Sequence, residues 1–191
     1  INPGKVYLSG INQLQKPILD LTLIIGKGSN NDLFEVDLMA LPHLFVSYSE
    51  TGQINLFLKD TVDTLTRHAD PGELQFACAL SKEMYSGLEN YLGKVKLISL
   101  FIRNEALEST RGSKYLFMQA LMKEMKRRQR VKQSSGKLIP MIVIIDDIFD
   151  IIITKRKYTG TYFLELLAAG KELEIYFIAA SVWTYRNLLS Q

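Results

Sequence analysis

Two neighbouring carboxylates, Asp146 and Asp147, directly follow a continuous apolar run at residues 141–145. Such a run is typical of a strand that is buried on both faces of a parallel sheet. Because ligands of these sheets bind at the carboxyl ends of the strands, the pair would stand where metal-assisted chemistry takes place. The alternative interpretation is structural: the two side chains face solvent or cap the helix that follows.

A second group of candidate residues is basic and lies on the helix expected at residues 115–132. The cations that share one face recur at i, i+3, i+4 and i+7: Lys123, Lys126, Arg127 and Arg130. Arg128 and Lys132 add to the charge of this helix. The face could contact a phosphate backbone or an acidic partner. It could equally be a solvated amphipathic face whose cations suit the C-terminus of the helix.

The few cysteine and histidine residues exclude several kinds of site. Cys78 is the one cysteine, so no intrachain disulfide forms, and with His43 and His68 it makes a Cys/His zinc cluster nearly impossible. No Ser/His/Asp or Cys/His spacing supports a hydrolase. We expect Cys78 to be an inert core residue and His43 to be a packed or turn residue.

Alternating strands and helices would position these groups. Strands are expected at residues 5–9, 19–26, 33–38, 44–46, 74–80, 95–102, 141–145 and 175–180, and helices at residues 51–68, 115–132 and 161–173. The turn cluster at residues 28–32 predicts that the strands on either side of it form a β-hairpin. The alternation that follows predicts βαβ units and a mainly parallel sheet flanked by helices.

The composition is that of one globular domain, with 191 residues, 47% of them apolar and 23% charged. A chain of this length can bury a sizeable core without disulfides or metal ions. The net charge of +3 is compatible with nucleic-acid binding but is weak evidence for it. The longest apolar runs, at residues 141–145 and 175–180, are too short to span a bilayer.

Five segments of the sequence carry a family resemblance. Residues 37–46 read DLMALPHLFV, residues 71–74 PGEL, residues 124–128 EMKRR, residues 142–150 IVIIDDIFD and residues 172–181 ELEIYFIAAS. In this order they resemble the "DL…MPHLLVAG", "PEEL", "EMERR", "VVIIDEFADL" and "AAGIHLILAT" motifs of FtsK/SpoIIIE DNA-translocase motors. The similarity spans roughly residues 23 to 181.

The resemblance implies a RecA-like P-loop core over residues 42–191, preceded by N-terminal strands and a β-hairpin in residues 1–41. It also implies that Asp146 would hold Mg²⁺ through water and that Asp147 would polarise the attacking water. The phosphate-binding loop of the family reads GxxxxGK[ST]. Its glycines let backbone N–H groups cradle phosphates, its lysine reaches the β- and γ-phosphates, and its hydroxyl holds Mg²⁺.

The segment that aligns with this loop departs from the motif at its defining positions. The residues at the two glycine positions, the lysine position and the hydroxyl position are Tyr48, Gln53, Ile54 and Asn55. Glu50 adds a negative charge, although Gly52 could allow a shifted, tighter turn. Loss of the lysine alone forfeits a charged hydrogen bond of about 1.5–3 kcal/mol, and each ~1.4 kcal/mol is a factor of about ten in affinity. We therefore expect millimolar or absent affinity for ATP.

Two further segments of the nucleotide site differ from the family. Residues 181–184 read SVWT where the family has "TQRP", so the glutamine that would sense the γ-phosphate is absent. Residues 79–82 read ALSK where the family has "IDPK". Together these changes predict a pseudo-ATPase without a cofactor; ATP and Mg²⁺, the latter held by Asp146, enter only if residual family activity survives.

A basic triplet, Lys155, Arg156 and Lys157, follows the two carboxylates. In hexameric translocases the loops of this region face the DNA channel, so the resemblance implies a DNA contact, while the alternative is an ordinary solvated loop.

The first functional hypothesis is a silent interaction module that assembles with its own copies or with active ATPase subunits, or binds DNA passively. The second is a DNA-translocating, DNA-segregating ATPase with weak nucleotide binding. The third is an inactive regulatory domain of a secretion-type FtsK-like protein, and all three imply a cytoplasmic location, with any membrane tether outside this chain.

Overall fold

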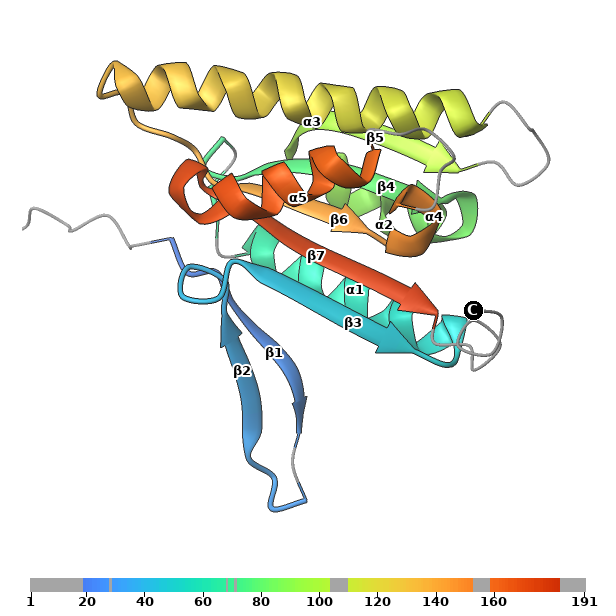
Figure 1. Ribbon diagram of the computed structural model, residues 1–191. Coiled ribbons are helices and arrows are strands. Elements are labelled where there is room, and N and C mark those ends of the chain that lie inside the picture. The colour runs from blue at the N-terminus through green and yellow to red at the C-terminus, as the bar shows by residue number, and fades with distance from the viewer. Residues whose placement is uncertain are drawn as a thin grey trace, which may run out of the picture.

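The computed structural model describes residues 19–27, 29–67, 69–70, 72–103, 110–152 and 159–182. Within them, five parallel strands form the central sheet in the order β3-β7-β6-β4-β5. These strands are β3 (His43–Tyr48), β4 (Gln75–Ser81), β5 (Lys96–Arg103), β6 (Met141–Ile145) and β7 (Ile175–Val182). All of their carboxyl ends therefore lie along one edge of the sheet, and all of their amino ends lie along the other (Figure 1).

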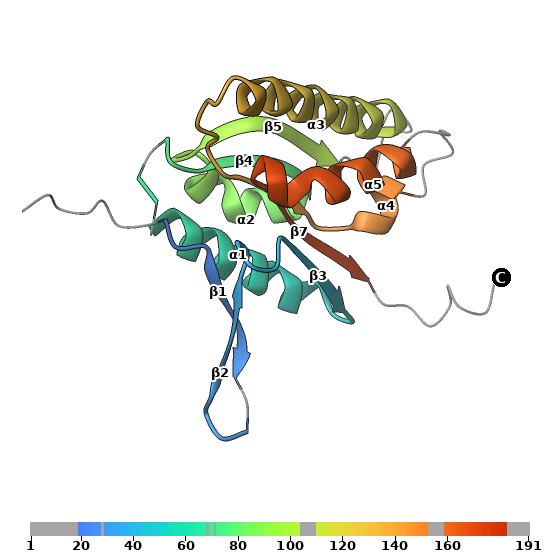
Figure 2. The ribbon, with the colours of Figure 1, turned by 60° about the vertical axis from the view of Figure 1, so that its left-hand side comes forward.

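An antiparallel hairpin precedes the sheet. It consists of β1 (Thr22–Lys27) and β2 (Leu33–Asp37), and it projects away from the sheet and its helices (Figure 1, Figure 2). Its outer part is uncovered, because Ile24 and Phe34 are both exposed. The predicted hairpin and the predicted, mainly parallel sheet flanked by helices are confirmed.

Helices cover both faces of the sheet (Figure 2). One face carries α1 (Thr51–Arg67) and α2 (Lys82–Leu92). The other carries α3 (Thr110–Gln133), α4 (Ile148–Ile152) and α5 (Thr159–Gly170), which continues into the short 3₁₀ helix η1 (Lys171–Leu173). No helix in the described part of the chain is long and apolar enough to cross a membrane.

The central strands are buried on both faces, as their continuous apolar runs predict. In β6, Val143 and Ile145 face the α3–α5 side, whereas Ile142 and Ile144 face the α1–α2 side. Cys78 of β4 is wholly buried on the α1–α2 side, and this burial raises the pKa of its thiol far above the ordinary value. It is a core residue, as expected.

Helix α2 is an element that the sequence analysis did not predict. It begins after Ser81, whose side-chain oxygen accepts a hydrogen bond from the backbone N–H of Met84 at 3.2 Å. This is an ordinary N-terminal cap. The buried residues Met84, Leu88 and Leu92 follow at intervals of four, which is the signal that could have revealed the helix. The strand expected at residues 5–9 lies outside the described residues.

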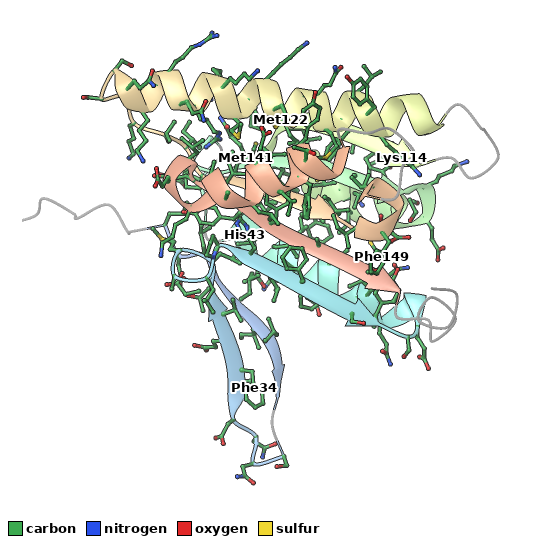
Figure 3. All side chains as sticks on the ribbon, in the orientation of Figure 1. Phe34, His43, Lys114, Met122, Met141 and Phe149 are labelled. Atoms are coloured by element: carbon green, nitrogen blue, oxygen red, sulfur yellow. The ribbon has the colours of Figure 1, made fainter. Side chains whose placement is uncertain are left out.

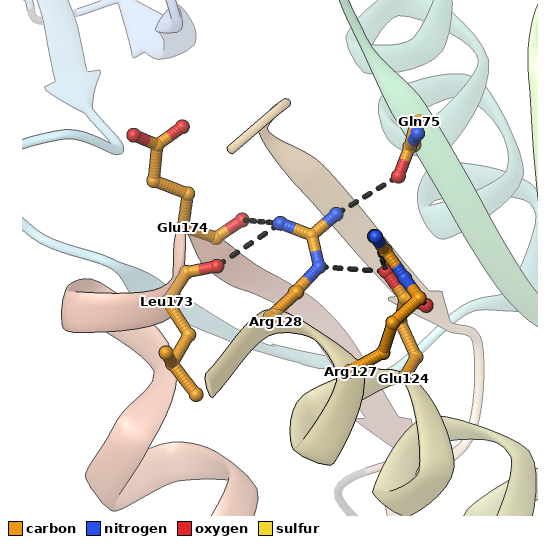
Figure 4. A network of polar contacts seen from close by, with 6 residues as sticks. All are labelled: Gln75, Glu124, Arg127, Arg128, Leu173 and Glu174. Atoms are coloured by element: carbon orange, nitrogen blue, oxygen red, sulfur yellow. Dashed lines mark hydrogen bonds and ion pairs between the residues drawn. The ribbon is translucent and has the colours of Figure 1, made fainter. Parts of the chain in front are cut away.

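Arg128, which the sequence analysis counted only as added charge on helix α3, does not lie on its exposed face. Its side chain is wholly buried, and its guanidinium joins α3 to β4 and to the turn between η1 and β7 (Figure 4). It donates to Glu124 at 2.9 Å, to Gln75 at 2.9 Å and to the backbone carbonyl oxygens of Leu173 and Glu174 at 3.0 and 3.3 Å. A buried cation is tolerated here because each of its nitrogens has an acceptor.

Candidate functional site

The carboxyl edge of the sheet brings several of the predicted site residues together. The strands β3, β7 and β6 are adjacent, with Tyr48 paired to Val182 and Ile145 paired to Ala179. Asp146 and Asp147 directly follow β6 and precede α4, whose residue Phe149 is labelled in Figure 3. The two carboxylates and Tyr48 therefore occupy one edge, on strands that are separated only by β7.

Asp146 is a nearly inaccessible residue with structural hydrogen bonds. It is 3% exposed, and its Oδ2 accepts a hydrogen bond of 2.6 Å from the backbone N–H of Ser81. Its own N–H donates to the carbonyl of Ala79 at 3.2 Å, and its carbonyl oxygen lies 3.4 Å from the hydroxyl of Tyr48. Asp146 thus connects the end of β6 to the start of α2, where a helix N-terminus favours a negative charge.

Asp147 is half-buried and immediately precedes the first residue of α4. That is the position at which a side chain caps a helix. The structure therefore places both carboxylates where the sequence analysis expected them, and their catalytic roles stay predictions. Ser81, a hydrogen-bond partner of Asp146, was missed, although a serine before a helix start is a recognisable capping signal.

In the segment aligned with the phosphate-binding loop, the connection between the strand and the helix is very short. β3 ends at Tyr48 and α1 begins at Thr51, so that only Ser49 and Glu50 lie between them. Gly52 is inside the helix, and Gly72 is the one glycine with a left-handed backbone among the described residues. The N–H of Gln53 already donates to the carbonyl of Glu50 at 3.1 Å.

The side chains of α1 that follow point in different directions. Ile54, at the lysine position, is 2% exposed and packs in the core with Leu58 and Val62. Gln53 is exposed and Asn55 is half-buried. No lysine or arginine occurs in residues 48–55. The positions aligned with the lysine and the hydroxyl of the phosphate-binding loop are therefore a core isoleucine and a half-buried asparagine.

Ser181 lies on β7, the strand between β3 and β6, and it pairs with Ser47 of β3. Its hydroxyl oxygen is buried, and no hydrogen-bond partner is found for it among the described residues. Trp183 and Thr184, which continue the predicted sensor segment, lie outside those residues, as do Lys155, Arg156 and Lys157. No group of three or more His, Cys, Asp or Glu side chains is arranged to hold a metal ion in the described part of the chain.

The basic residues predicted on α3 lie on its solvent face: Lys123, Lys126, Arg127 and Arg130 are all exposed. Arg127 donates two hydrogen bonds to Glu124, at 2.7 and 2.6 Å. Burial opposes ionisation of Glu124, yet Arg127 and Arg128 together hold the pKa of its carboxyl below the ordinary value. Lys132 reaches the carbonyl oxygen of Glu172 at 3.1 Å.

Comparison with solved structures identifies ATPase domains of similar fold. The cytoplasmic domain of the Type VII secretion ATPase EccC from Thermomonospora curvata gives a TM-score of 0.69 at 19% identity, over 85% of this chain and 21% of that one. ATPases 2 and 3 of EssC from Geobacillus thermodenitrificans give 0.56 at 13% identity, over 85% and 29%. The pCW3 conjugation coupling protein TcpA, in its monomer form with ATPγS, gives 0.52 at 12% identity, over 85% and 48%.

These likenesses concern the fold. The EccC and EssC neighbours are FtsK/SpoIIIE-type P-loop ATPase domains, so the RecA-like P-loop fold predicted from the sequence is confirmed. This chain spans about a fifth to a half of the length of these three proteins. No protein-family model matches the sequence, and no curated protein matches it.

Proposed function

We propose that this chain is an ATPase-like domain that does not turn over ATP and that acts through contacts with other macromolecules. The observation that carries the proposal is the junction of β3 and α1, where Ile54 packs in the core at the position of the phosphate-binding lysine. The missing charge-assisted hydrogen bond weakens nucleotide binding by about 1.5–3 kcal/mol, or roughly tenfold to a hundredfold. Glu50 and the short connection act in the same direction.

The loss cannot be reversed by a single substitution. A lysine at position 54 would place an ammonium group among Leu58, Val62 and the other side chains of the core, where an unpaired charge is costly. The side chain at this position thus contributes to the core packing of α1 and does not face a phosphate site.

The partners follow from the exposed surfaces and from the neighbours. The domain would assemble with its own copies or with active ATPase subunits in the cytoplasm, and the cations of α3 would contact DNA phosphates or an acidic partner. The likeness to the secretion ATPases EccC and EssC favours a regulatory, inactive domain within a larger secretion-type ATPase among these possibilities. An intact P-loop elsewhere in the same polypeptide would support that assignment.

A second candidate is an ATPase with weak nucleotide binding. Asp146 and Asp147 remain at the end of β6, and the buried hydroxyl of Ser181 has no partner among the described residues. These groups could meet a ligand that enters along the carboxyl edge. In this alternative Asp146 would carry Mg²⁺ through water, in competition with its hydrogen bond to Ser81.

Isothermal titration of Mg-ATP into the purified chain separates the two candidates. The matched variant is Asp146→Asn, which keeps the size of a buried side chain and removes its charge; circular dichroism would verify that it folds. We expect no saturable heat that depends on Asp146 up to millimolar ATP. Micromolar binding by the native chain that disappears in Asp146→Asn would overturn the proposal and favour the weak ATPase.

A further inference from the structure

A hollow of about 360 Å³ opens at the amino edge of the sheet, opposite the edge that carries Asp146 and Asp147. Its polar lining consists of Gln75 at the start of β4, Lys96 at the start of β5, Arg127 of α3 and Lys137 of the segment before β6. The remaining lining is aliphatic. No carboxylate contributes to the wall, so the hollow presents donors from four different parts of the chain.

Gln75 gives the hollow a fixed donor in its floor. The residue is 3% exposed, and its Oε1 accepts a hydrogen bond of 2.9 Å from Nη2 of Arg128 (Figure 4). Arginine can only donate, so the amide must present its oxygen to Arg128 and its NH₂ group on the other side. Among the described residues no acceptor is found for that NH₂ group, and Gln75 lines the hollow. The NH₂ group is therefore available to donate to an acceptor in the hollow.

The charge around the hollow is positive. Lys96 and Lys137 are exposed and form no ion pair with another described residue. Nε and Nη2 of Arg127 donate hydrogen bonds to Glu124, whereas Nη1 takes no part in that contact. Glu124 is shared with Arg128, so one carboxylate faces two guanidinium groups. The other nearby carboxylate, Glu174, is flanked in turn by Arg128 and Lys137. Three cations therefore lie near the two carboxylates, and Lys96 adds a further positive charge to the wall of the hollow.

We propose that the hollow at the amino edge binds a phosphate group, with the amide of Gln75 in its floor and Lys96, Arg127 and Lys137 around its rim. Phosphate suits the site better than a carboxylate, since a tetrahedral anion can accept hydrogen bonds from several directions at once. The group can come from a free phosphate compound or from a nucleic-acid backbone. The second source is sterically reasonable, because the exposed cations of α3 continue from Arg127 along the same helix.

Nuclear magnetic resonance of the ¹⁵N-labelled chain tests this directly. Pyrophosphate and a short DNA duplex are titrated separately, and the side-chain NH₂ signals of Gln75 are followed. We expect these signals to move in a saturable way with at least one probe. Lys96→Gln and Lys137→Gln should each weaken binding about tenfold, as expected for the loss of one charge-assisted contact. The matched control is Lys59→Gln, a change at an exposed residue of α1 on the other face of the sheet, which should leave pyrophosphate affinity within about twofold.

The outcomes are distinct. Saturation by pyrophosphate identifies a free phosphate compound as ligand, and a response to DNA alone identifies the nucleic-acid backbone; both support the site. The proposal is overturned if neither probe moves the Gln75 signals, or if the Lys96→Gln, Lys137→Gln double variant binds as tightly as the native chain. Because the site is on the edge opposite Asp146, any ATP binding that survives Asp146→Asn but not the double variant belongs here.

Discussion

At the carboxyl edge of the sheet, the polar side chains near the strand ends are carboxylates and hydroxyls, among them Asp146, Tyr48 and Ser181. Around the hollow at the amino edge they are donors, and one of these residues, Gln75, is fixed by a hydrogen bond from the buried guanidinium of Arg128. The carboxyl edge is the usual ligand site of such a fold, yet its Asp146 is occupied by a structural contact to Ser81. The difference shows that the fold alone does not determine which edge of the sheet can bind a ligand, because this depends on the individual side chains at each edge.

Of the substitutions that test the two edges, removal of the Arg128 side chain should lower the stability of the protein most. Arg128→Ala leaves Glu124, Gln75 and two backbone carbonyls without a buried donor, which is expected to lower the free energy of unfolding by about 3–5 kcal/mol. Urea denaturation measures the loss. The control Arg130→Ala, an exposed residue of the same helix, should change stability by less than about 0.5 kcal/mol. Equal effects of the two substitutions would contradict a structural role for the buried guanidinium.

The sequence contained part of this information. The run at residues 141–145 predicted a strand buried on both faces, because no polar side chain interrupts it. Arg128 was considered only for its charge, although it lies three residues after Met125 and seven after Leu121, on the buried stripe of α3. Helical periodicity therefore pointed to burial, but the acceptors that make it possible come from β4 and the η1–β7 turn, which a local pattern cannot reveal.

The same limit applies to the candidate site. The sequence analysis located Asp146 and the altered loop and predicted a helix from residue 51, but it considered Ile54 only as the residue at the lysine position. In the structure α1 begins at Thr51, so Ile54 is a core residue. The recurrence of Ile54, Leu58 and Val62 at helical spacing was available as a signal for this burial. The contact between Asp146 and Ser81 joins residues 65 positions apart and could not be predicted from either segment.

The next largest loss of stability is expected for a substitution of Gly170, which lies at the amino edge. A Cβ atom there would lie 2.6 Å from Cε1 of His43 and 2.6 Å from the carbonyl oxygen of Ile175, so the glycine is required by close packing. Gly170→Ala should lower the free energy of unfolding by about 1–3 kcal/mol, as measured by thermal or urea denaturation.

The matched control for Gly170 is Gly87 of α2, where a Cβ atom would meet nothing within 4 Å. Gly87→Ala should stabilise the protein by about 0.5–1 kcal/mol, because alanine loses less conformational freedom in a helix. If both substitutions shift stability in the same direction, the close approach of His43 to Gly170 does not constrain the fold.

A smaller effect is expected at the carboxyl edge, where the cap of α2 can be removed without breaking the contact of Asp146. Ser81→Ala deletes the side-chain acceptor for Met84 but keeps the backbone N–H that Asp146 binds. The expected cost is about 1 kcal/mol in urea denaturation. Ser134→Ala, which removes an exposed hydroxyl bonded to the carbonyl of Val131, should cost less than about 0.5 kcal/mol. A loss at Ser81 as large as that of Arg128→Ala would mean that the two edges contribute equally to stability.

The smallest expected effect on stability is its dependence on pH, which we attribute to a single residue at the amino edge, His43. His43, at the amino end of β3, packs edge-on against Phe177, and its Nε2 lies 3.0 Å from the carbonyl oxygen of Leu167. Burial lowers the pKa of its imidazole, and hydrogen bonds to the backbone offset only part of this shift. The unfolded chain therefore takes up the proton more readily than the folded one, so protonation favours unfolding. The contribution of His43 to stability is complete above its ordinary pKa of about 6.5 and declines as the pH falls below that value.

Urea denaturation between about pH 8 and pH 5.5 isolates this contribution, since most carboxylates stay ionised over that range. The His43→Gln variant keeps an N–H donor for Leu167 but cannot take up a proton, so its stability should vary less with pH than that of the native chain. His68→Gln, measured in parallel, separates the contribution of the other histidine. Identical pH profiles for the native chain and His43→Gln would show that the packed imidazole is not the group that destabilises the fold in acid.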